Sequence, residues 1–320
     1  MSKVASKRVV DLFAGCGGLT LGFQNQGFQL VVAADNWKTA IDIYKNNFSH
    51  DIFPIDLSDI ESSIEVLKDF EPDIIIGGPP CQDFSQAGKR DENLGRGNLT
   101  YSFARIIEQV KPQYFVMENV DQLVKKDVYK ESIKLLKSRS YGITVQLLDA
   151  SLCGVPQKRK RYFVIGEFNG EDNFLDDFLL NNLASKPMTV RDYLGTTLGT
   201  EYYYRHPRSY ARRGIYSIDE PSATIRSVNR PIPKGYPGHH LDATSNLELV
   251  RPLTTKERSL IQTFPESFKW VNGSKTNIEL AIANAVPVKL AEYVASALRQ
   301  HIEGNTTQYK QMSLFSMTTF

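Results

Sequence analysis

The first half of the chain alternates short apolar runs with segments of helical periodicity. Strands are predicted by the apolar runs at residues 8–13, 29–34, 73–77, 114–117 and 161–166. Helices are predicted by the periodic segments at residues 19–26, 38–47, 101–110 and 128–138. Strands that alternate with helices are typical of βαβ units, so we expect an α/β fold with a mostly parallel, doubly wound sheet.

The alternation ends near residue 166. Residues 170–250 contain many prolines, tyrosines and turn dipeptides but few clean periods, which indicates an irregular, loop-rich module. Helical patterns return at residues 254–262 and 288–301. We therefore expect residues 1–168 and 276–320 to form one domain and residues 169–275 to form a second, smaller domain.

Composition narrows the class of protein without identifying it. The chain has 320 residues, 41% of them hydrophobic and 23% charged, which is typical of a globular protein. Its three cysteines show no zinc spacing and are too few for a disulfide framework, so we expect no metal site and a reducing compartment. The first residues lack the apolar segment of a signal peptide, and residues 280–298 are too polar to span a membrane. We expect a cytoplasmic protein.

A glycine-rich turn follows the first predicted strand. Asp11-Leu-Phe-Ala-Gly-Cys-Gly-Gly18 places three glycines where a strand leads into a helix, so the backbone could pass close to a ligand. Asp35 ends the second predicted strand and could accept hydrogen bonds from a ribose diol, while Asp56 could accept one from an adenine amino group. The alternative is a glycine-rich turn that binds nothing.

Two further polar segments follow predicted strands and would meet at the same edge of the sheet. In Gly77-Gly-Pro-Pro-Cys-Gln-Asp-Phe-Ser85, two prolines fix the backbone just before Cys81, a candidate nucleophile or else a small buried side chain. Glu118 follows the strand at residues 114–117 and could converge on Cys81; alone, it would be a surface acid.

The basic segment Gln157-Lys-Arg-Lys-Arg161 leads into the last predicted strand of the first domain. In an extended chain Gln157, Arg159 and Arg161 share one face, opposite Lys158 and Lys160. Two arginines on one face suit planar acceptors such as a phosphate or a base carbonyl, and the alternative is a solvated basic turn.

Taken in order, these motifs resemble the DNA (cytosine-5) methyltransferase family. Residues 251–265 and Asn284-Ala-Val-Pro287 are similar to two later motifs of that family. The resemblance covers most of residues 8–166 and 251–300, and it implies a Rossmann-like domain that binds S-adenosylmethionine. It implies that the cofactor is bound by Phe13, Gly15, Cys16, Gly17, Asp35, Asn36, Trp37, Asp56, Leu57, Pro79, Leu99, Asn284 and Val286.

The resemblance also implies a mechanism. Cys81 would add to C6 of a cytosine flipped out of duplex DNA, while Glu118 holds or protonates N3. Arg161 would contact the O2 carbonyl, with Arg159 in support. Residues 85–99 resemble the loop that closes over the substrate in this family.

The middle of the chain corresponds to the family's target recognition domain. Between residues 202 and 234, seven basic residues and two acidic ones give a net charge of +5, whereas the whole chain carries only +2. Arginine and tyrosine suit contacts with phosphates and base edges. We expect DNA contacts from Ser85, Gln157, Arg205, Arg208, Arg212, Arg213, Thr224, Arg226, Arg230 and Lys234.

The resulting prediction is a bacterial restriction–modification enzyme. It would act as a monomer on double-stranded DNA, close to the nucleoid, and be paired with a restriction endonuclease. The alternatives are a tRNA cytosine-5 methyltransferase on the same scaffold and a non-catalytic nucleic-acid-binding protein.

Overall fold

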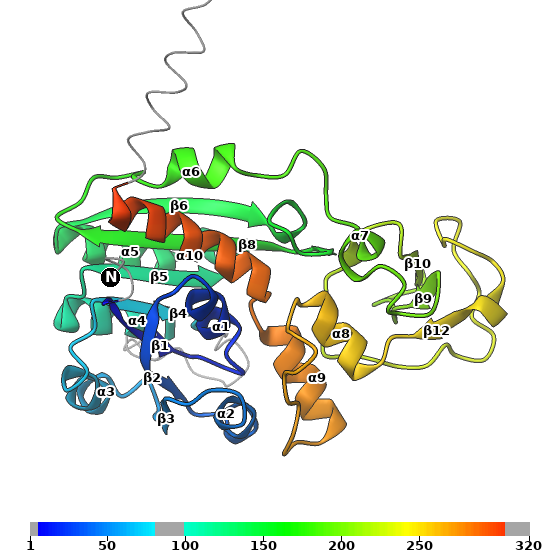
Figure 1. The fold of residues 1–320 in the computed structure, drawn as a ribbon, viewed down its shortest axis with the longest axis horizontal. Coiled ribbons are helices and arrows are strands. Elements are labelled where there is room, and N and C mark those ends of the chain that lie inside the picture. Colours follow the sequence, from blue (N-terminus) through cyan, green and yellow to red (C-terminus); the bar gives the residue numbers. More distant parts are fainter. Residues whose placement is uncertain (1–5, 81–98, 305–320) are drawn as a thin grey trace, which may run out of the picture.

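A seven-stranded sheet forms the centre of the protein. The computed structural model describes residues 6–80 and 99–304. The strand order is β3-β2-β1-β4-β5-β8-β6, in which the first five strands are parallel and β8 runs antiparallel to both β5 and β6 (Figure 1). The strands are β1 (Arg8–Leu12), β2 (Gln29–Asp35), β3 (Asp51–Pro54), β4 (Ile74–Gly77), β5 (Tyr114–Asn119), β6 (Tyr141–Asp149) and β8 (Lys160–Phe168).

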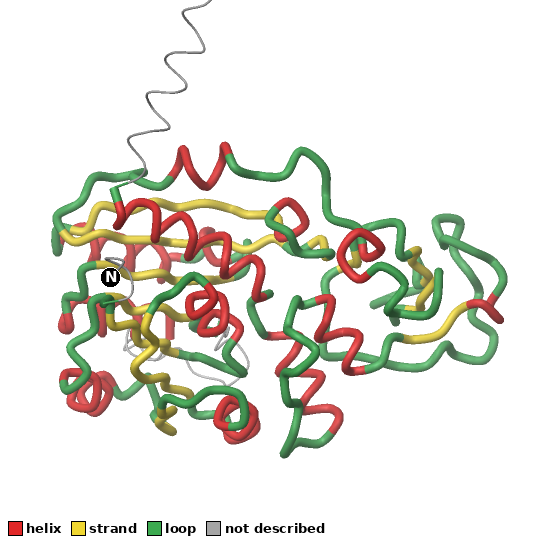
Figure 2. Tube along the Cα trace, viewed as in Figure 1, coloured by secondary structure: helices red, strands yellow, loops and turns green. Residues whose placement is uncertain are grey.

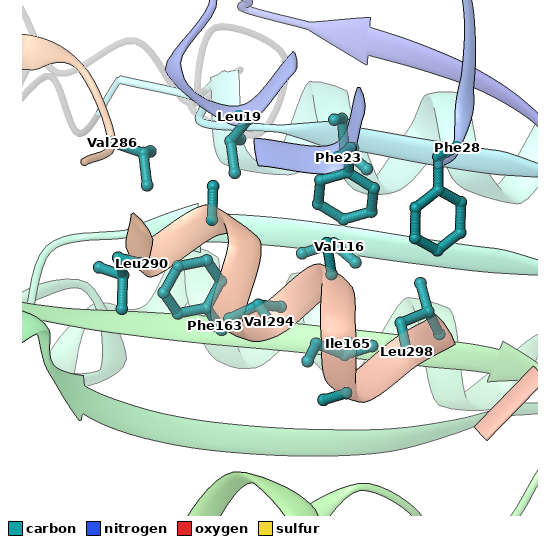
Figure 3. Close-up of a cluster of buried hydrophobic side chains, with 14 of the residues drawn as sticks. Leu19, Phe23, Phe28, Val116, Phe163, Ile165, Val286, Leu290, Val294 and Leu298 are labelled. Atoms are coloured by element: carbon teal, nitrogen blue, oxygen red, sulfur yellow. The ribbon is translucent and has the colours of Figure 1, made fainter. Parts of the chain in front are cut away.

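Helices cover both faces of this sheet. They are α1 (Gly18–Asn25), α2 (Lys38–Lys45), α3 (Ile60–Lys68), α4 (Leu99–Val110), α5 (Asp127–Ser138), α6 (Asp176–Asn181) and α10 (Val288–Glu303). Because successive side chains in a strand point to opposite faces, Ile74 and Ile76 join a core with α1 and α10, whereas Ile75 joins a core with α4. Figure 3 shows Leu290, Val294 and Leu298 of α10 packed over the strands in the first core. The expected doubly wound, mostly parallel sheet is confirmed.

The hydrophobic pattern found most elements of the first half and missed a few. The structure contains all five predicted strands and all four predicted helices of the first half, with ends shifted by a few residues. Strand β6 was missed because polar residues such as Thr144 and Gln146 interrupt its apolar run. Helix α9 (Lys275–Asn284) was also missed, because its apolar residues do not follow a helical period. Helix α3 was missed although Ile60, Ile64 and Leu67 recur at a helical spacing along it.

The irregular part of the chain lies at one end of the molecule, and most of it is loop (Figure 2). Strands β10 (Ile215–Ser217), β9 (Tyr202–Tyr204) and β12 (Val250–Pro252) form a small sheet. A two-residue strand, β11 (Ser222–Ala223), pairs with β7 (Gln157–Lys158), which directly precedes β8. The remaining elements are α7 (Val190–Leu194), α8 (Thr255–Ile261) and three short 3-10 helices, η1 (Leu123–Lys125), η2 (Ala150–Leu152) and η3 (Leu247–Leu249).

Residues after 168 do not all pack with the irregular part. Leu175 and Leu179, from and just before α6, are buried in the same core as α1 and α10. By contrast, Val190, Tyr203 and Tyr216 form a separate core with residues of α8 and α9. None of the helices in the described ranges combines the length and the apolar character needed to cross a membrane.

Candidate active site

A cavity of about 800 Å³ opens at the carboxyl ends of the parallel strands. Ligands in open α/β folds bind at this edge, because the loops that leave the strands surround it. The lining includes the ends of β1, β2, β4 and β5 together with the segment that joins α9 to α10. The cavity therefore brings together the segments that the sequence places far apart.

The glycine-rich turn between β1 and α1 forms one wall of this cavity. Phe13 and Gly15 both have a φ of 55°, a left-handed conformation that costs a residue other than glycine of order 1–3 kcal/mol. The Gly15 amide donates a 2.8 Å hydrogen bond to Asp35 Oδ2. A Cβ on Gly18 would lie 2.2 Å from the Val286 carbonyl oxygen, so the turn needs glycine to approach the α9–α10 segment.

Two carboxylates, Asp35 and Asp56, line this cavity as well. Asp35 Oδ1 accepts a 2.8 Å bond from the Trp37 amide; burial raises the pKa of Asp35, and the bonds from Trp37 and Gly15 act in the opposite direction. Asp56 accepts bonds from both the amide and the hydroxyl of Ser58, and both go to Oδ1. Oδ2 of Asp56 has no hydrogen-bond partner within residues 6–80 and 99–304, so it is available to a ligand.

The cavity gathers nearly all of the residues expected to bind the cofactor. Gly17 is absent from its lining: a Cβ there would lie 2.3 Å from the Phe48 ring, so this glycine allows close packing behind the turn. The expected residues that do line the cavity are Phe13, Gly15, Cys16, Asp35, Asn36, Trp37, Asp56, Leu57, Pro79, Leu99, Asn284 and Val286.

Glu118 and Arg161 line the same cavity and are paired. Arg161 Nε lies 2.8 Å from Glu118 Oε1, across adjacent strands β5 and β8. Burial raises the pKa of Glu118, while the positive charges of Arg161 and Arg159 oppose that shift. The result is a buried carboxyl group that binds a proton more readily than an exposed glutamate.

The segment that leads to Cys81 runs beside this pair. A Cβ on Gly78 would lie 3.4 Å from Glu118 Oε2, and Asn119 Nδ2 donates a 2.8 Å bond to the Pro79 carbonyl oxygen. Asn119 was not among the expected site residues, although it follows Glu118 directly in the sequence. Pro79 and Pro80 both line the cavity, whereas Cys81 and Ser85 lie outside the described residues.

Arg159 and Gln157 share the face that the sequence indicated, but the structure buries both of them. Arg159 donates to the carbonyl oxygens of Ala283 and Ala285, at 3.0 and 3.1 Å. Burial and the charge of Arg161 lower the pKa of Arg159 to about 9, while Glu118 opposes that shift. Gln157 is fully buried, so its expected contact with DNA has no exposed surface from which to be made.

A buried network surrounds Gln157 and joins distant segments. Its Nε2 donates a 2.7 Å bond to Gln262 Oε1, and its Oε1 accepts a 3.0 Å bond from the Ile225 amide. Gln262 donates in turn to the carbonyl oxygens of Ile282 and Ala285. Sequence reasoning missed the partner role of Gln262, because only the fold brings residues 157, 225, 262 and 285 together.

Apart from Ser85 and Gln157, the residues expected to contact DNA fall into two groups of four. Thr224, Arg205, Arg213 and Arg226 use their side chains in bonds within the protein. The other four are exposed, and none of their side chains has a hydrogen bond or ion pair within the described part of the chain: Arg208, Arg212, Arg230 and Lys234.

Among the described residues, no group of three or more histidine, cysteine, aspartate or glutamate side chains could hold a metal ion.

Comparisons with known proteins agree with this geometry. A family model for C-5 cytosine-specific DNA methylase matches residues 7–300. The Type II methyltransferase M.HindV of Haemophilus influenzae is 58% identical over 292 residues, which cover 91% of this chain and 96% of that protein. M.HgiDI of Herpetosiphon aurantiacus, also a Type II methyltransferase, is 51% identical over 307 residues, or 96% of this chain and 98% of that protein.

The fold is also found in a solved structure. The crystal structure of S. pombe Dnmt2 methyltransferase has a TM-score of 0.70 at 18% identity, covering 92% of this chain and 98% of that one. At this identity the likeness concerns the fold alone. The family match and the two relatives carry the identification: the chain belongs to the C-5 cytosine-specific DNA methylase family, and its activity is that of a DNA (cytosine-5)-methyltransferase.

Proposed function

We propose that this enzyme methylates a cytosine flipped out of a specific duplex DNA sequence, through a covalent bond between Cys81 and C6. One observation carries the proposal: the Glu118–Arg161 pair opens into the same cavity as the glycine-rich turn, beside the segment that ends at Cys81. A base and a nucleotide-like cofactor could therefore meet at this edge of the sheet.

The residues of the cavity fit S-adenosylmethionine, which supplies an activated methyl group on its sulfonium. Asp35 presents a carboxylate that can accept bonds from the ribose hydroxyls, and Asp56 has a free oxygen for the adenine amino group. The open space at Gly15, where a Cβ would have no neighbour within 4 Å, leaves room for the cofactor close to the backbone.

Each proposed catalytic residue has one task. The Cys81 thiolate attacks C6 and forms a C6–S bond, while Glu118 delivers a proton to N3 and Arg161 stabilises the negative charge that develops on O2. The activated C5 then accepts the methyl group. Loss of the C5 proton to solvent, return of the N3 proton to Glu118 and cleavage of the C6–S bond release the product and restore the Cys81 thiolate. The raised pKa of Glu118 suits this role, because the acid must hold its proton before transfer.

We further propose that the enzyme protects host DNA from a cognate endonuclease, as its similarity to Type II methyltransferases suggests. The core at Val190, Tyr203 and Tyr216 favours a recognition domain that begins near α7 rather than at residue 169. Because Gln157 and Arg159 are buried, we assign them to positioning the site rather than to contact with DNA.

The proposal is tested by transfer of a labelled methyl group to duplex DNA. The wild type should label cytosine C5, and duplex containing 5-fluorocytosine should trap a covalent adduct. Cys81→Ala should abolish both, whereas Glu118→Gln should slow transfer strongly, since an amide cannot deliver the proton. Full transfer by Cys81→Ala would disprove the covalent mechanism. Faster labelling of tRNA than of duplex DNA would instead favour an RNA substrate.

A further inference from the structure

The basic residues between positions 202 and 234, the segment named here the recognition segment, are not equivalent, because some have acidic partners. Arg213 pairs with Glu220, and its guanidinium also lies 4.2 Å from the centre of the Tyr216 ring. Arg191 pairs with both Glu201 and Asp219. The two acidic residues between positions 202 and 234 are thus already neutralised by Arg213 and Arg191.

Two other arginines hold two separate segments together. Arg205, just after β9, donates from Nε and Nη2 to the Thr224 carbonyl oxygen at 3.2 and 2.9 Å. Arg226 donates in the opposite direction, to the His206 carbonyl oxygen. From α8, Arg258 donates to the Arg226 carbonyl oxygen. The bonds in both directions fix the guanidinium groups of Arg205 and Arg226 at one junction.

Positive charge at this junction is not balanced by carboxylates of the described residues. Arg258 forms a salt bridge with Glu279, but none of Arg205, Arg208, Arg212 and Arg226 pairs with a carboxylate within residues 6–80 and 99–304. Arg226 Nε is buried and has no hydrogen-bond partner in these residues.

Nearby charges act directly on Arg226. Burial lowers the pKa of Arg226 to about 10, and the charges of Arg205, Arg208 and Arg212 contribute to that shift. Like charges that repel at one place favour the binding of an anion there.

We propose that Arg205, Arg208, Arg212 and Arg226 form a binding site for one phosphate of the DNA backbone. This inference rests on the proposed function, because it takes duplex DNA as the substrate. Arg205 and Arg226 give the site a fixed position, while Arg208 and Arg212 reach it from an exposed loop. Guanidinium groups present paired donors that match the oxygens of a phosphodiester.

A backbone phosphate fits this junction better than a base edge does. Reading a base requires one free guanidinium aimed into a groove, whereas here several guanidinium groups crowd together and two of them are bound to carbonyl oxygens. A contact of this kind sets the register of the recognition segment on the duplex. Sequence would then be read by other side chains.

The test measures binding to a fluorescein-labelled, mixed-sequence duplex over a series of KCl concentrations. Each phosphate contact contributes about 0.9 to the slope of log K against log salt. We expect Arg212→Gln and Arg226→Gln each to reduce the slope. The double variant should reduce it by a total of about 0.9, because both residues serve the same phosphate. The control is Lys134→Gln, which removes an exposed charge on α5, outside the cluster, and should leave the slope unchanged.

Several outcomes would overturn the inference. Unchanged slopes would exclude a phosphate contact, and a double-variant loss of about 1.8 would indicate two separate phosphates. An equal loss of slope in Lys134→Gln would show that any surface charge suffices.

If Arg226→Gln fails to fold, Arg208→Gln replaces it, since that side chain is exposed. Methyl transfer is followed in parallel, because its absence in the wild type would contradict the proposed function but not the phosphate site.

Discussion

At the scale of single residues, Asp11 is a fully buried titratable group in β1, the strand that leads to the glycine-rich turn. Its Oδ2 accepts a 2.6 Å bond from Thr20, whose hydroxyl also contacts the Tyr44 hydroxyl at 2.8 Å. Oδ1 of Asp11 has no partner within the described ranges. Burial raises the pKa of Asp11 to about 7, Thr20 opposes the shift, and the charge of Asp35 adds to it. The fold therefore holds a carboxyl group that favours its protonated form.

This pKa predicts how the stability of the protein depends on pH. Between pH 4 and 7 the unfolded chain releases the Asp11 proton and the folded protein keeps it, so this group lowers the free energy of unfolding by about 1.4 kcal/mol per pH unit. Asp11→Asn cannot titrate and should lack this component. Urea unfolding of both proteins at several pH values should show their difference changing with pH and levelling off above pH 7. A difference that is independent of pH would mean that Asp11 ionises normally.

At the scale of elements, α1 and α10 pack closely because α1 contains Gly22. A Cβ at this position would lie 2.4 Å from Ala291 Cβ and 2.8 Å from the Glu292 amide nitrogen. Glycine is intrinsically unfavourable within a helix, by about 1 kcal/mol relative to alanine. The close approach of α10 therefore requires glycine at position 22, although alanine would be more favourable for the helix itself.

Replacing Gly22 by alanine tests whether packing against α10 outweighs the helix preference for alanine. In an isolated helix Gly22→Ala would be stabilising, but here the added methyl group would clash with the Ala291 Cβ and the backbone of α10, and we expect a loss of about 1–3 kcal/mol in the free energy of unfolding. Urea unfolding measures this loss. A gain in stability would show that α1 can shift away from α10 without cost.

At the scale of the whole molecule, Gln157 and Gln262 connect the large sheet to the recognition segment. Gln157 precedes β8, and its side-chain oxygen accepts a hydrogen bond from the Ile225 amide. Gln157 also donates to Gln262, which donates in turn to the carbonyl oxygens of Ile282 and Ala285. Ala285 also lines the cavity. One buried pair of side chains thus relates the recognition segment to the catalytic edge.

This connection predicts a loss of stability rather than only a loss of DNA affinity. Gln157→Leu leaves the Ile225 amide without its partner, and unpaired buried polar groups cost about 1–3 kcal/mol each. We expect a total loss of about 3 kcal/mol on urea unfolding. The neighbouring Lys158→Ala removes an exposed side chain and serves as the control, with stability close to that of the wild type. If Gln157→Leu kept the stability of the wild type but bound DNA more weakly, Gln157 would be a DNA-contacting residue after all.

The sequence by itself determined where the buried strands lie along the chain and which residues follow them. Apolar runs mark strands whatever surrounds them, and Asp35, Glu118 and the glycine-rich turn come directly after such runs. Parallel strands end at a common edge, so the place of the site followed from local pattern alone. The family motifs added the activity that the comparisons confirm.

Only the tertiary structure decided which charged and polar side chains are free. Arg205, Arg213 and Arg226 look alike in the sequence. In the structure Arg205 and Arg226 bind carbonyl oxygens beside other arginines, whereas Arg213 pairs with Glu220. Gln157 and Gly17 likewise take their roles from Gln262 and Phe48, which lie far away in the chain. Partners across long separations depend on packing, and a local pattern of residues carries no record of them.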